Sequence, residues 1–385
     1  MDDHGPPPRS WLLDVLWLDA VIVPWWTTRS GAERYIAVPD VGSVGQLLPW
    51  RPSSVIASTR RVSDDRASAI RVRDGAAVAG VLVASTWSRR RRLSVHGTAS
   101  LIGQVGDRLG VPDATGIVIS GPPRANQKPV IQLHDRAGRT IAYVKVAWNG
   151  LTQRLLSHER RALETLATRE DCGFVVPRIL ATGSFASVTW LAIGPITVAR
   201  RHRADLHAID RLASAVERTA PTWRGPTSEA VFLTELRAQS ASLEVGRCAV
   251  EALAAREADR PISLGASHGD FVPWNMLSGY PRAAVWDWER YSLAEPLGVD
   301  RLHYRFQVGV QRKRRSAAEV LTSLDSELDT VLPDVARDRR GSHLDWYIVS
   351  LLCRYERDSL EQGTPGLRDR IAHLTAVLNQ RGVLA

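Results

Sequence analysis

Three polar side chains in one short stretch of the C-terminal half have the types needed to bind a divalent cation and accept a proton. The segment HGDFVPWN carries Asp270 and Asn275, and Asp287 follows in VWDWE. Because its glycine and proline disfavour a helix, the first segment is expected to be a shaped loop. The sequence NMLSGYPRAAVWDW predicts a hairpin centred near Pro281, which would place Asn275 and Asp287 side by side.

Two carboxylates and a carboxamide that converge on one point need a cation between them, because the two carboxylates repel each other. Hard oxygen ligands in small number are typical of Mg²⁺, which keeps several waters and binds substrate phosphates. The cluster of Asp270, Asn275 and Asp287 therefore predicts a magnesium site for phosphate chemistry.

A lysine occupies the middle of an apolar strand. In TIAYVKVAW, Lys145 has apolar residues on both sides, and an unpaired buried ammonium would lose its proton. In the helix that follows, Glu159 shares the stripe of Leu155, Leu163 and Leu166. We expect Lys145 and Glu159 to be partners, and the pair alone fits a structural ion pair as well as a functional one.

The elements that must position these residues change in character along the chain. Strands with turns between them and one helix are predicted up to about residue 195, and mostly helices after residue 200. The predicted strands are 115–120, 129–135, 140–148, 175–185 and 187–195, with a helix at 151–167. The predicted helical segments are 203–219, 228–258, 316–331, 343–360 and 367–380, around a non-helical island at 263–298.

The first 110 residues contain no catalytic constellation. Six of the 13 tryptophans lie in the first 90 residues, and they are expected in a core. Strand-like sequences at 34–40 and 67–85 and a helix that closes at Gly110 predict a small α+β region.

Composition excludes several classes of protein. The net charge is +9, but no dense basic stripe with interleaved aromatics indicates a nucleic-acid partner. Three scattered cysteines fit neither a disulfide framework nor a zinc site. The acidic, proline-rich start is unlike a signal peptide, and the apolar stretches are too short or interrupted to span a bilayer. A cytoplasmic protein without a membrane partner is expected.

The segments HGDFVPWN and VWDWE resemble the catalytic loop and metal-binding motif of the aminoglycoside phosphotransferase/choline kinase-like family. The Asp-to-Asn spacing equals that of the protein-kinase catalytic loop. The resemblance covers roughly 111–360 and implies an α+β, bilobal, protein kinase-like fold. It implies an accessory α+β region at 1–110, a five-stranded nucleotide-binding N-lobe with one helix at 111–196, and a helical C-lobe at 197–385 with the catalytic loop and acceptor site.

The resemblance also implies roles for the C-terminal cluster. Asp270 would be the catalytic base, and Asn275 and Asp287 would hold Mg²⁺ on the β- and γ-phosphates of ATP. Asp300 would support the catalytic segment structurally, and His268 would shape the loop by hydrogen bonding.

Nucleotide-binding roles follow for the N-lobe in the same way. Lys145 would hold the α- and β-phosphates, with Glu159 fixing it. Backbone groups of Ala192, Ile193 and Gly194 would meet the adenine.

One feature departs from the family pattern. The phosphate-covering loop should be rich in glycine, but SGPPRANQK offers only Gly121 followed by two prolines. Arg124, Asn126 and Lys128 would then contact phosphates through their side chains.

The resemblance implies an ATP-dependent kinase that phosphorylates a hydroxyl of a small molecule. Aminoglycosides, sugars, macrolides, choline-like amines and peptide hydroxyls all stay open as acceptors, as does the oligomeric state. The alternatives are a weakly active or inactive nucleotide-binding regulator of the same fold and, from the positive charge, a nucleic-acid-binding protein.

Overall fold

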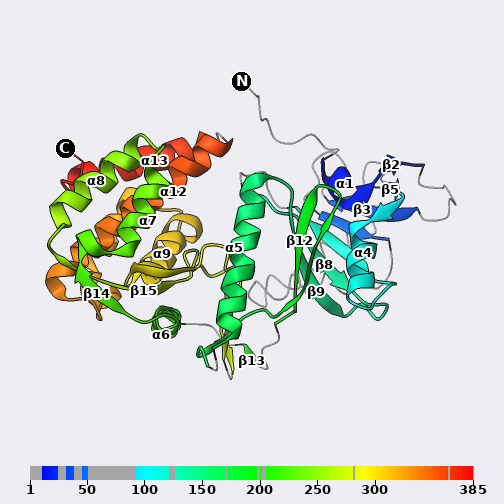
Figure 1. Cartoon of the computed structure of the whole chain (residues 1–385), viewed down its shortest axis with the longest axis horizontal. Helices are drawn as coiled ribbons and strands as arrows, with labels where there is room; N and C mark the ends of the chain where they lie inside the picture. The colour runs from blue at the N-terminus through cyan, green and yellow to red at the C-terminus, as the bar shows by residue number, and fades with distance from the viewer. Residues whose placement is uncertain are drawn as a thin grey trace. The chain divides into compact units, whose positions relative to one another are not determined.

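The computed structural model describes residues 11–24, 32–38, 46–50, 92–120, 126–169, 171–196, 200–201, 205–280, 282–362 and 365–384. The chain divides into two compact units (Figure 1). Unit 1 comprises Met1–Arg160 and Pro177–Pro195, and unit 2 comprises Arg161–Val176 and Ile196–Ala385. Among the described residues, no helix combines the length and apolar character needed to cross a membrane.

Unit 1 is built on one large sheet. Its strand order is β11-β12-β9-β8-β7-β4-β3-β5-β2, and neighbouring strands pair antiparallel. The strands of the sheet are β2 (Val21–Ile22), β3 (Glu33–Val38), β4 (Gln46–Pro49), β5 (Arg92–His96), β7 (Thr115–Ile119), β8 (Val130–His134), β9 (Thr140–Ala147), β11 (Ile179–Phe185) and β12 (Val188–Ile193). The remaining elements are α1 (Trp11–Leu16), the pair β1 (Trp17–Leu18) and β6 (Ala99–Ser100), and α4 (Leu101–Arg108), while α5 (Gly150–Ala167) runs from unit 1 into unit 2.

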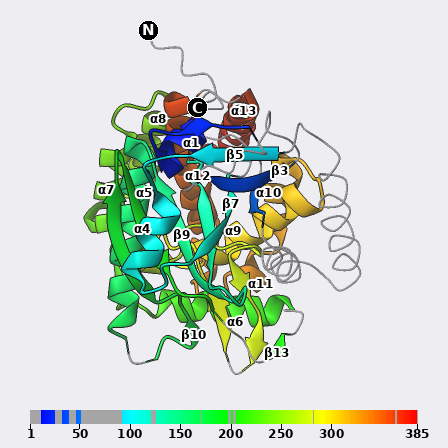
Figure 2. The same cartoon turned by 90° about the vertical axis from the view of Figure 1, so that its right-hand side faces the viewer.

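The core of unit 1 lies between this sheet and the helices α1 and α4. Helix α4 is visible beside the strands in Figure 2. Leu16 and Val105 of these helices are fully buried with Val144 of β9. Helix α4 begins where the hydroxyl of Ser100 accepts a hydrogen bond from the Gly103 N–H. It ends before Gly110, whose φ of +73° is a conformation that favours glycine, as predicted for the helix end.

The five strands expected for a nucleotide-binding lobe are present and adjacent, as β7, β8, β9, β11 and β12. The sheet is larger than expected, however, because β4 pairs with β7 and continues the ladder into the N-terminal region. The alternation of apolar residues predicted the strands themselves, but it carries no information on which edge a further strand joins. The expected strand at 67–85 lies outside the described residues.

Unit 2 is mainly helical. Its helices are α6 (Leu206–Glu217), α7 (Val231–Ser240), α8 (Val245–Glu257), α9 (Val299–Gln307), α10 (Ala317–Ser326), α11 (Leu328–Val331), α12 (Arg340–Gln362) and α13 (Pro365–Gln380), with short helical turns at Thr227–Glu229, Val308–Arg312 and Arg337–Arg339. Its strands are β10 (Phe174–Val175), β13 (Arg200–Arg201), β14 (Trp223–Pro226), β15 (Pro261–Ser267), β16 (Met276–Leu277), β17 (Gly279–Tyr280), β18 (Ala283–Val285) and β19 (Ser292–Pro296). They form the small sheets β10-β18-β16, β13-β17 and β14-β15-β19.

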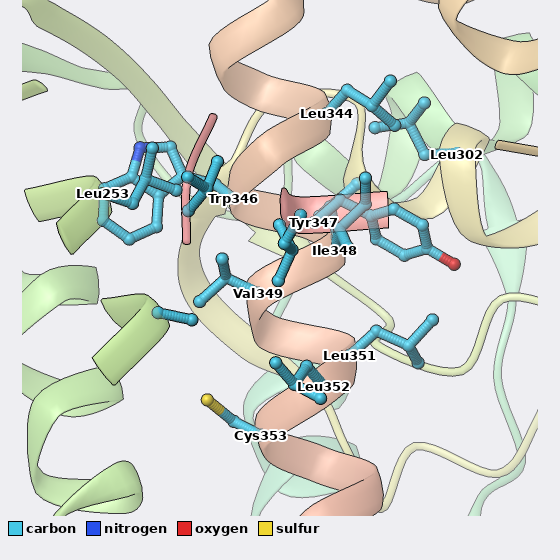
Figure 3. Packing of buried hydrophobic residues seen from close by; sticks show 14 of the residues in the cluster. Leu253, Leu302, Leu344, Trp346, Tyr347, Ile348, Val349, Leu351, Leu352 and Cys353 are labelled. Carbon is cyan, nitrogen blue, oxygen red and sulfur yellow. The ribbon is translucent and has the colours of Figure 1, made fainter. Parts of the chain in front are cut away.

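Helix α12 runs through the core of unit 2 and packs residues on several of its sides, as Figure 3 shows. Trp346, Ile348 and Leu352 of this helix are fully buried, together with Leu253 of α8 and Leu302 of α9.

One helical expectation needs correction, and one helix lies where no element was expected. The segment 228–258 forms two helices, α7 and α8, and not one continuous run. Helix α9 begins directly after the expected non-helical segment 263–298, following Gly298 with φ of +86°, in a stretch for which no element was expected. Its apolar stripe is short and interrupted by Arg301 and His303, both of which are buried, so periodicity does not reveal it.

Candidate active site

The HGDFVPWN segment forms the connection between β15 and β16, and a buried aspartate holds its first residues. Asp300, at the start of α9, accepts hydrogen bonds from the His268 N–H at 2.7 Å, the Gly269 N–H at 3.1 Å and the Ser267 hydroxyl at 2.9 Å. The side chain is 1% exposed. These contacts agree with the supporting role expected for Asp300.

The backbone geometry at position 269 requires a glycine. Its φ is +76°, and a Cβ atom there would lie 2.3 Å from the carbonyl oxygen of Arg290. Any other residue would force the loop away from the segment that follows β18.

His268 ties the loop to the segment that carries Asp287. Its Nδ1 accepts a hydrogen bond from the Asp270 N–H at 3.2 Å, so the other ring nitrogen, Nε2, donates to the Trp286 carbonyl at 3.0 Å. The ring is fully buried and packs on Trp288, with ring centroids 4.5 Å apart. The contacts agree with a loop-shaping role for this histidine.

The carboxylate of Asp270 is held on both oxygens. Asn275 Nδ2 donates to Oδ2 at 3.0 Å, and His303 Nε2 lies 3.2 Å from Oδ1. Burial opposes ionisation, but the hydrogen bond from His303 and the charge of Arg354 outweigh it, so the pKa of Asp270 lies well below its ordinary value. The side chain keeps 33% of its surface exposed, so an ionised acceptor faces outward from the loop.

The predicted hairpin is present, with a register one residue away from the expected one. Met276 of β16 pairs with Val285 of β18, and the Trp286 N–H donates to the Asn275 carbonyl at 3.0 Å. Asn275 is therefore opposite Trp286, and Asp287 follows one position later with φ of +71°. Asn275 and Asp287 are brought to the same end of the hairpin, as expected, although not directly across from each other.

The donor set at this end of the hairpin fits Mg²⁺. Asn275 uses its amide nitrogen for the Asp270 carbonyl and carboxylate, each at 3.0 Å, so Oδ1 is the atom suited to a cation. Asp287 adds carboxylate oxygens from the adjacent strand end. Glu289, two residues beyond Asp287, is buried, at 7% exposed.

In unit 1, the predicted pair of Lys145 and Glu159 is present. Lys145 Nζ lies 2.6 and 2.7 Å from the two carboxylate oxygens of Glu159. Ala142 and Val144 of β9 face the core shared with α1 and α4, so the alternation of the strand turns Lys145 to the opposite face, toward α5. Lys145 is 8% exposed and Glu159 is fully buried, so each charge is compensated by the other.

The expected adenine-binding residues lie at the end of β12. Ala192 and Ile193 pair with β9 on one side and with β11 on the other. The Gly194 N–H donates to the Arg178 carbonyl at 2.8 Å. The expected phosphate contacts Gly121 and Arg124 lie outside the described residues.

Sequence reasoning missed three side chains that surround the HGDFVPWN loop. His303 of α9 contacts Asp270, Tyr347 of α12 contacts His303, and Arg354 of α12 donates to the Gly269 carbonyl at 2.8 Å. One signal was available, because Asp300 and His303 are three residues apart and so share a face of a helix.

Comparisons with known proteins give one family and several solved structures. Residues 127–297 match the model of the phosphotransferase enzyme family, and no curated protein matches the chain. A thermostable mutant of an aminoglycoside phosphotransferase, solved with AMP-PNP and hygromycin B, is 13% identical with a TM-score of 0.47, covering 72% of this chain and 98% of its own.

Two further solved structures are similar. A putative fructosamine-3-kinase from Haemophilus somnus is 9% identical with a TM-score of 0.43, covering 72% of this chain and 96% of its own. An aminoglycoside-3′-phosphotransferase of type VIII is 18% identical with a TM-score of 0.40, covering 65% of this chain and 99% of its own.

The family match spans Lys145, Glu159, the HGDFVPWN loop and Asp287, which are the residues and motifs that carried the resemblance. It confirms that resemblance: residues 127–297 of this chain match the phosphotransferase enzyme family.

Proposed function

We propose that the protein transfers the γ-phosphate of ATP to a hydroxyl of a small molecule of aminoglycoside, sugar or amino-alcohol type. The observation that carries the proposal is Asp270, an ionised and partly exposed carboxylate fixed on both oxygens within a loop of the matched family region. The proposal includes the protein kinase-like fold, with nucleotide binding assigned to 111–196 and catalysis and acceptor binding to 197–385.

Asp270 acts as the base in this proposal. Its low pKa makes it a weak base, so it orients the acceptor hydroxyl by accepting its hydrogen bond and takes the proton late in the reaction. This suits phosphoryl transfer, in which positioning and charge neutralisation do most of the work. Each carboxylate oxygen has a further lone pair for the hydroxyl beyond the bonds to Asn275 and His303.

Asn275 and Asp287 hold Mg²⁺ in this proposal. The ion, when bound, neutralises charge on the β- and γ-phosphates. The protein orients the two side chains through the hydrogen bond from the Trp286 N–H to the Asn275 carbonyl at the end of the hairpin.

Lys145 binds the α- and β-phosphates, and Glu159 holds its ammonium in place. Because both groups are buried, loss of either partner would leave the other charge uncompensated. The contacts of Ala192, Ile193 and Gly194 with adenine, and of Gly121 and Arg124 with phosphate, are part of the same proposal.

An acceptor screen tests the function. ADP release from Mg·ATP is measured with libraries of aminoglycosides, sugars and amino alcohols, and at least one acceptor is expected to raise the rate above that without acceptor. Thermal unfolding of the wild type should shift upward with Mg·ATP, and less so for Asp287→Ala. Asp329→Asn, a change at an exposed ion pair with Arg337, serves as the control. Equal shifts for all three proteins would refute the metal assignment.

A further inference from the structure

A chain of hydrogen bonds runs from the core of unit 2 to the carboxylate of Asp270. His303 Nε2 lies 3.2 Å from Asp270 Oδ1, and His303 Nδ1 lies 3.2 Å from the Tyr347 hydroxyl. Both His303 and Tyr347 are 3% exposed, and Tyr347 is seen among the core residues around α12 in Figure 3. Helices α9 and α12, which are distant in sequence, therefore both contribute side chains to the hydrogen-bond chain that ends at the Asp270 carboxylate.

The direction of donation along this chain follows from its members. An ionised carboxylate only accepts hydrogen bonds, so His303 Nε2 carries the hydrogen and Nδ1 accepts from the Tyr347 hydroxyl. Burial lowers the pKa of His303, against the opposing effect of Asp270, and burial raises the pKa of Tyr347 well above its ordinary value. A neutral His303 imidazole and a protonated Tyr347 hydroxyl are the forms that this order of donors and acceptors requires.

The second oxygen of Asp270 is held by Asn275 Nδ2 at 3.0 Å. The terminal torsion of an aspartate is soft, so a carboxylate held at one oxygen only can rotate widely. Two donors on two different oxygens fix its plane. The donor at Oδ1 comes from α9 and the donor at Oδ2 from the loop, so the orientation depends on the packing of α9 against α12.

We propose that His303, aligned by Tyr347, is a positioning residue that sets the orientation of the Asp270 carboxylate for phosphoryl transfer. The inference rests on the proposed function, because it assigns Asp270 the role of base. A purely structural role would require only the volume of the buried imidazole. A positioning role requires a hydrogen-bond donor at the place of Nε2.

Four variants separate these roles. His303→Leu fills the site without a donor, and His303→Gln returns an N–H at a similar reach. Tyr347→Phe removes one oxygen and keeps the ring. His343→Leu is the matched control, because His343 is 1% exposed and its Nδ1 lies 2.9 Å from the Leu297 carbonyl, away from the His303–Asp270 contact.

The experiment measures kcat and the KM for ATP by ADP release with Mg·ATP and the best acceptor of the screen, after circular dichroism has established folding. His303→Leu should lower kcat about 10- to 100-fold with an unchanged KM for ATP. His303→Gln should restore most of the rate, Tyr347→Phe should lower it several-fold, and His343→Leu should match the wild type.

A folded His303→Leu variant with wild-type kcat would overturn the inference, as would His303→Gln being as slow as His303→Leu. If both His303 variants fail to fold, Tyr347→Phe decides, and an unchanged kcat overturns the inference. A wild type no faster than Asp270→Asn would instead overturn the proposed function.

Discussion

Removal of the Asp300 carboxylate tests how the HGDFVPWN loop is held in place. In Asp300→Ala, the His268 N–H and the Gly269 N–H lose an acceptor inside the protein, as does the Ser267 hydroxyl. A buried donor left without a partner costs about 1–3 kcal/mol. The Gly269 N–H keeps the Ser267 oxygen at 3.0 Å, so we expect a total loss of about 3 kcal/mol in the free energy of unfolding.

Urea unfolding followed by tryptophan fluorescence measures this loss, with Ser267→Ala as the comparison. Ser267→Ala removes one of the three bonds to Asp300 and the second acceptor of the Gly269 N–H, which keeps Asp300, and should cost about 1 kcal/mol. A folded Asp300→Ala variant should also release ADP more slowly, because the segment that carries Asp270 loses its anchor. Unfolding of Asp300→Ala within about 0.5 kcal/mol of the wild type, with unchanged ADP release, would refute the reasoning.

Three further predictions concern strain, pH and reactivity. Gly269→Ala should lower the thermal midpoint and ADP release together, because its Cβ would lie 2.3 Å from the Arg290 carbonyl oxygen; a variant as stable as the wild type would contradict the loop geometry. Burial lowers the pKa of His343 from 6.5 to about 4. The stability that the neutral imidazole contributes is therefore complete above pH 6.5. It falls by about 3 kcal/mol as the pH decreases toward 4, because the unfolded state takes up the proton first. His343→Gln should flatten this part of the stability profile, measured by urea unfolding at a series of pH values, and an unchanged slope would contradict it. Burial raises the pKa of Cys353 to about 12, so a thiol reagent at pH 8 should label exposed Cys248 in the native protein and Cys353 only after unfolding, as peptide mass spectrometry would show.

The parts of the site that lie close together in sequence were predictable from it. Lys145 and Glu159 are separated by one turn between a strand and a helix, and the periods of these two elements place them face to face. The motif HGDFVPWN predicted the loop and its tie to Asp300 through a family resemblance. Asn275 and Asp287 were expected at one end of a hairpin, and the register error of one residue arose because alternation does not specify the length of the turn.

Contacts made by tertiary packing were not predictable in this way. Tyr347 contacts His303 behind Asp270 only because α9 packs beside α12, and no local pattern encodes that arrangement. The extension of the sheet through β4 and β7 has the same origin, because pairing at a sheet edge depends on how distant strands meet.

Phosphoryl transfer itself is the most direct test of the account. With ATP labelled at the γ-phosphate and Mg²⁺, the wild type should transfer label to an acceptor hydroxyl, and Asp270→Asn should transfer it at least about 100-fold more slowly while still being stabilised by Mg·ATP. Transfer by Asp270→Asn at the wild-type rate, or no transfer by the wild type to any acceptor of the screen, would contradict the account.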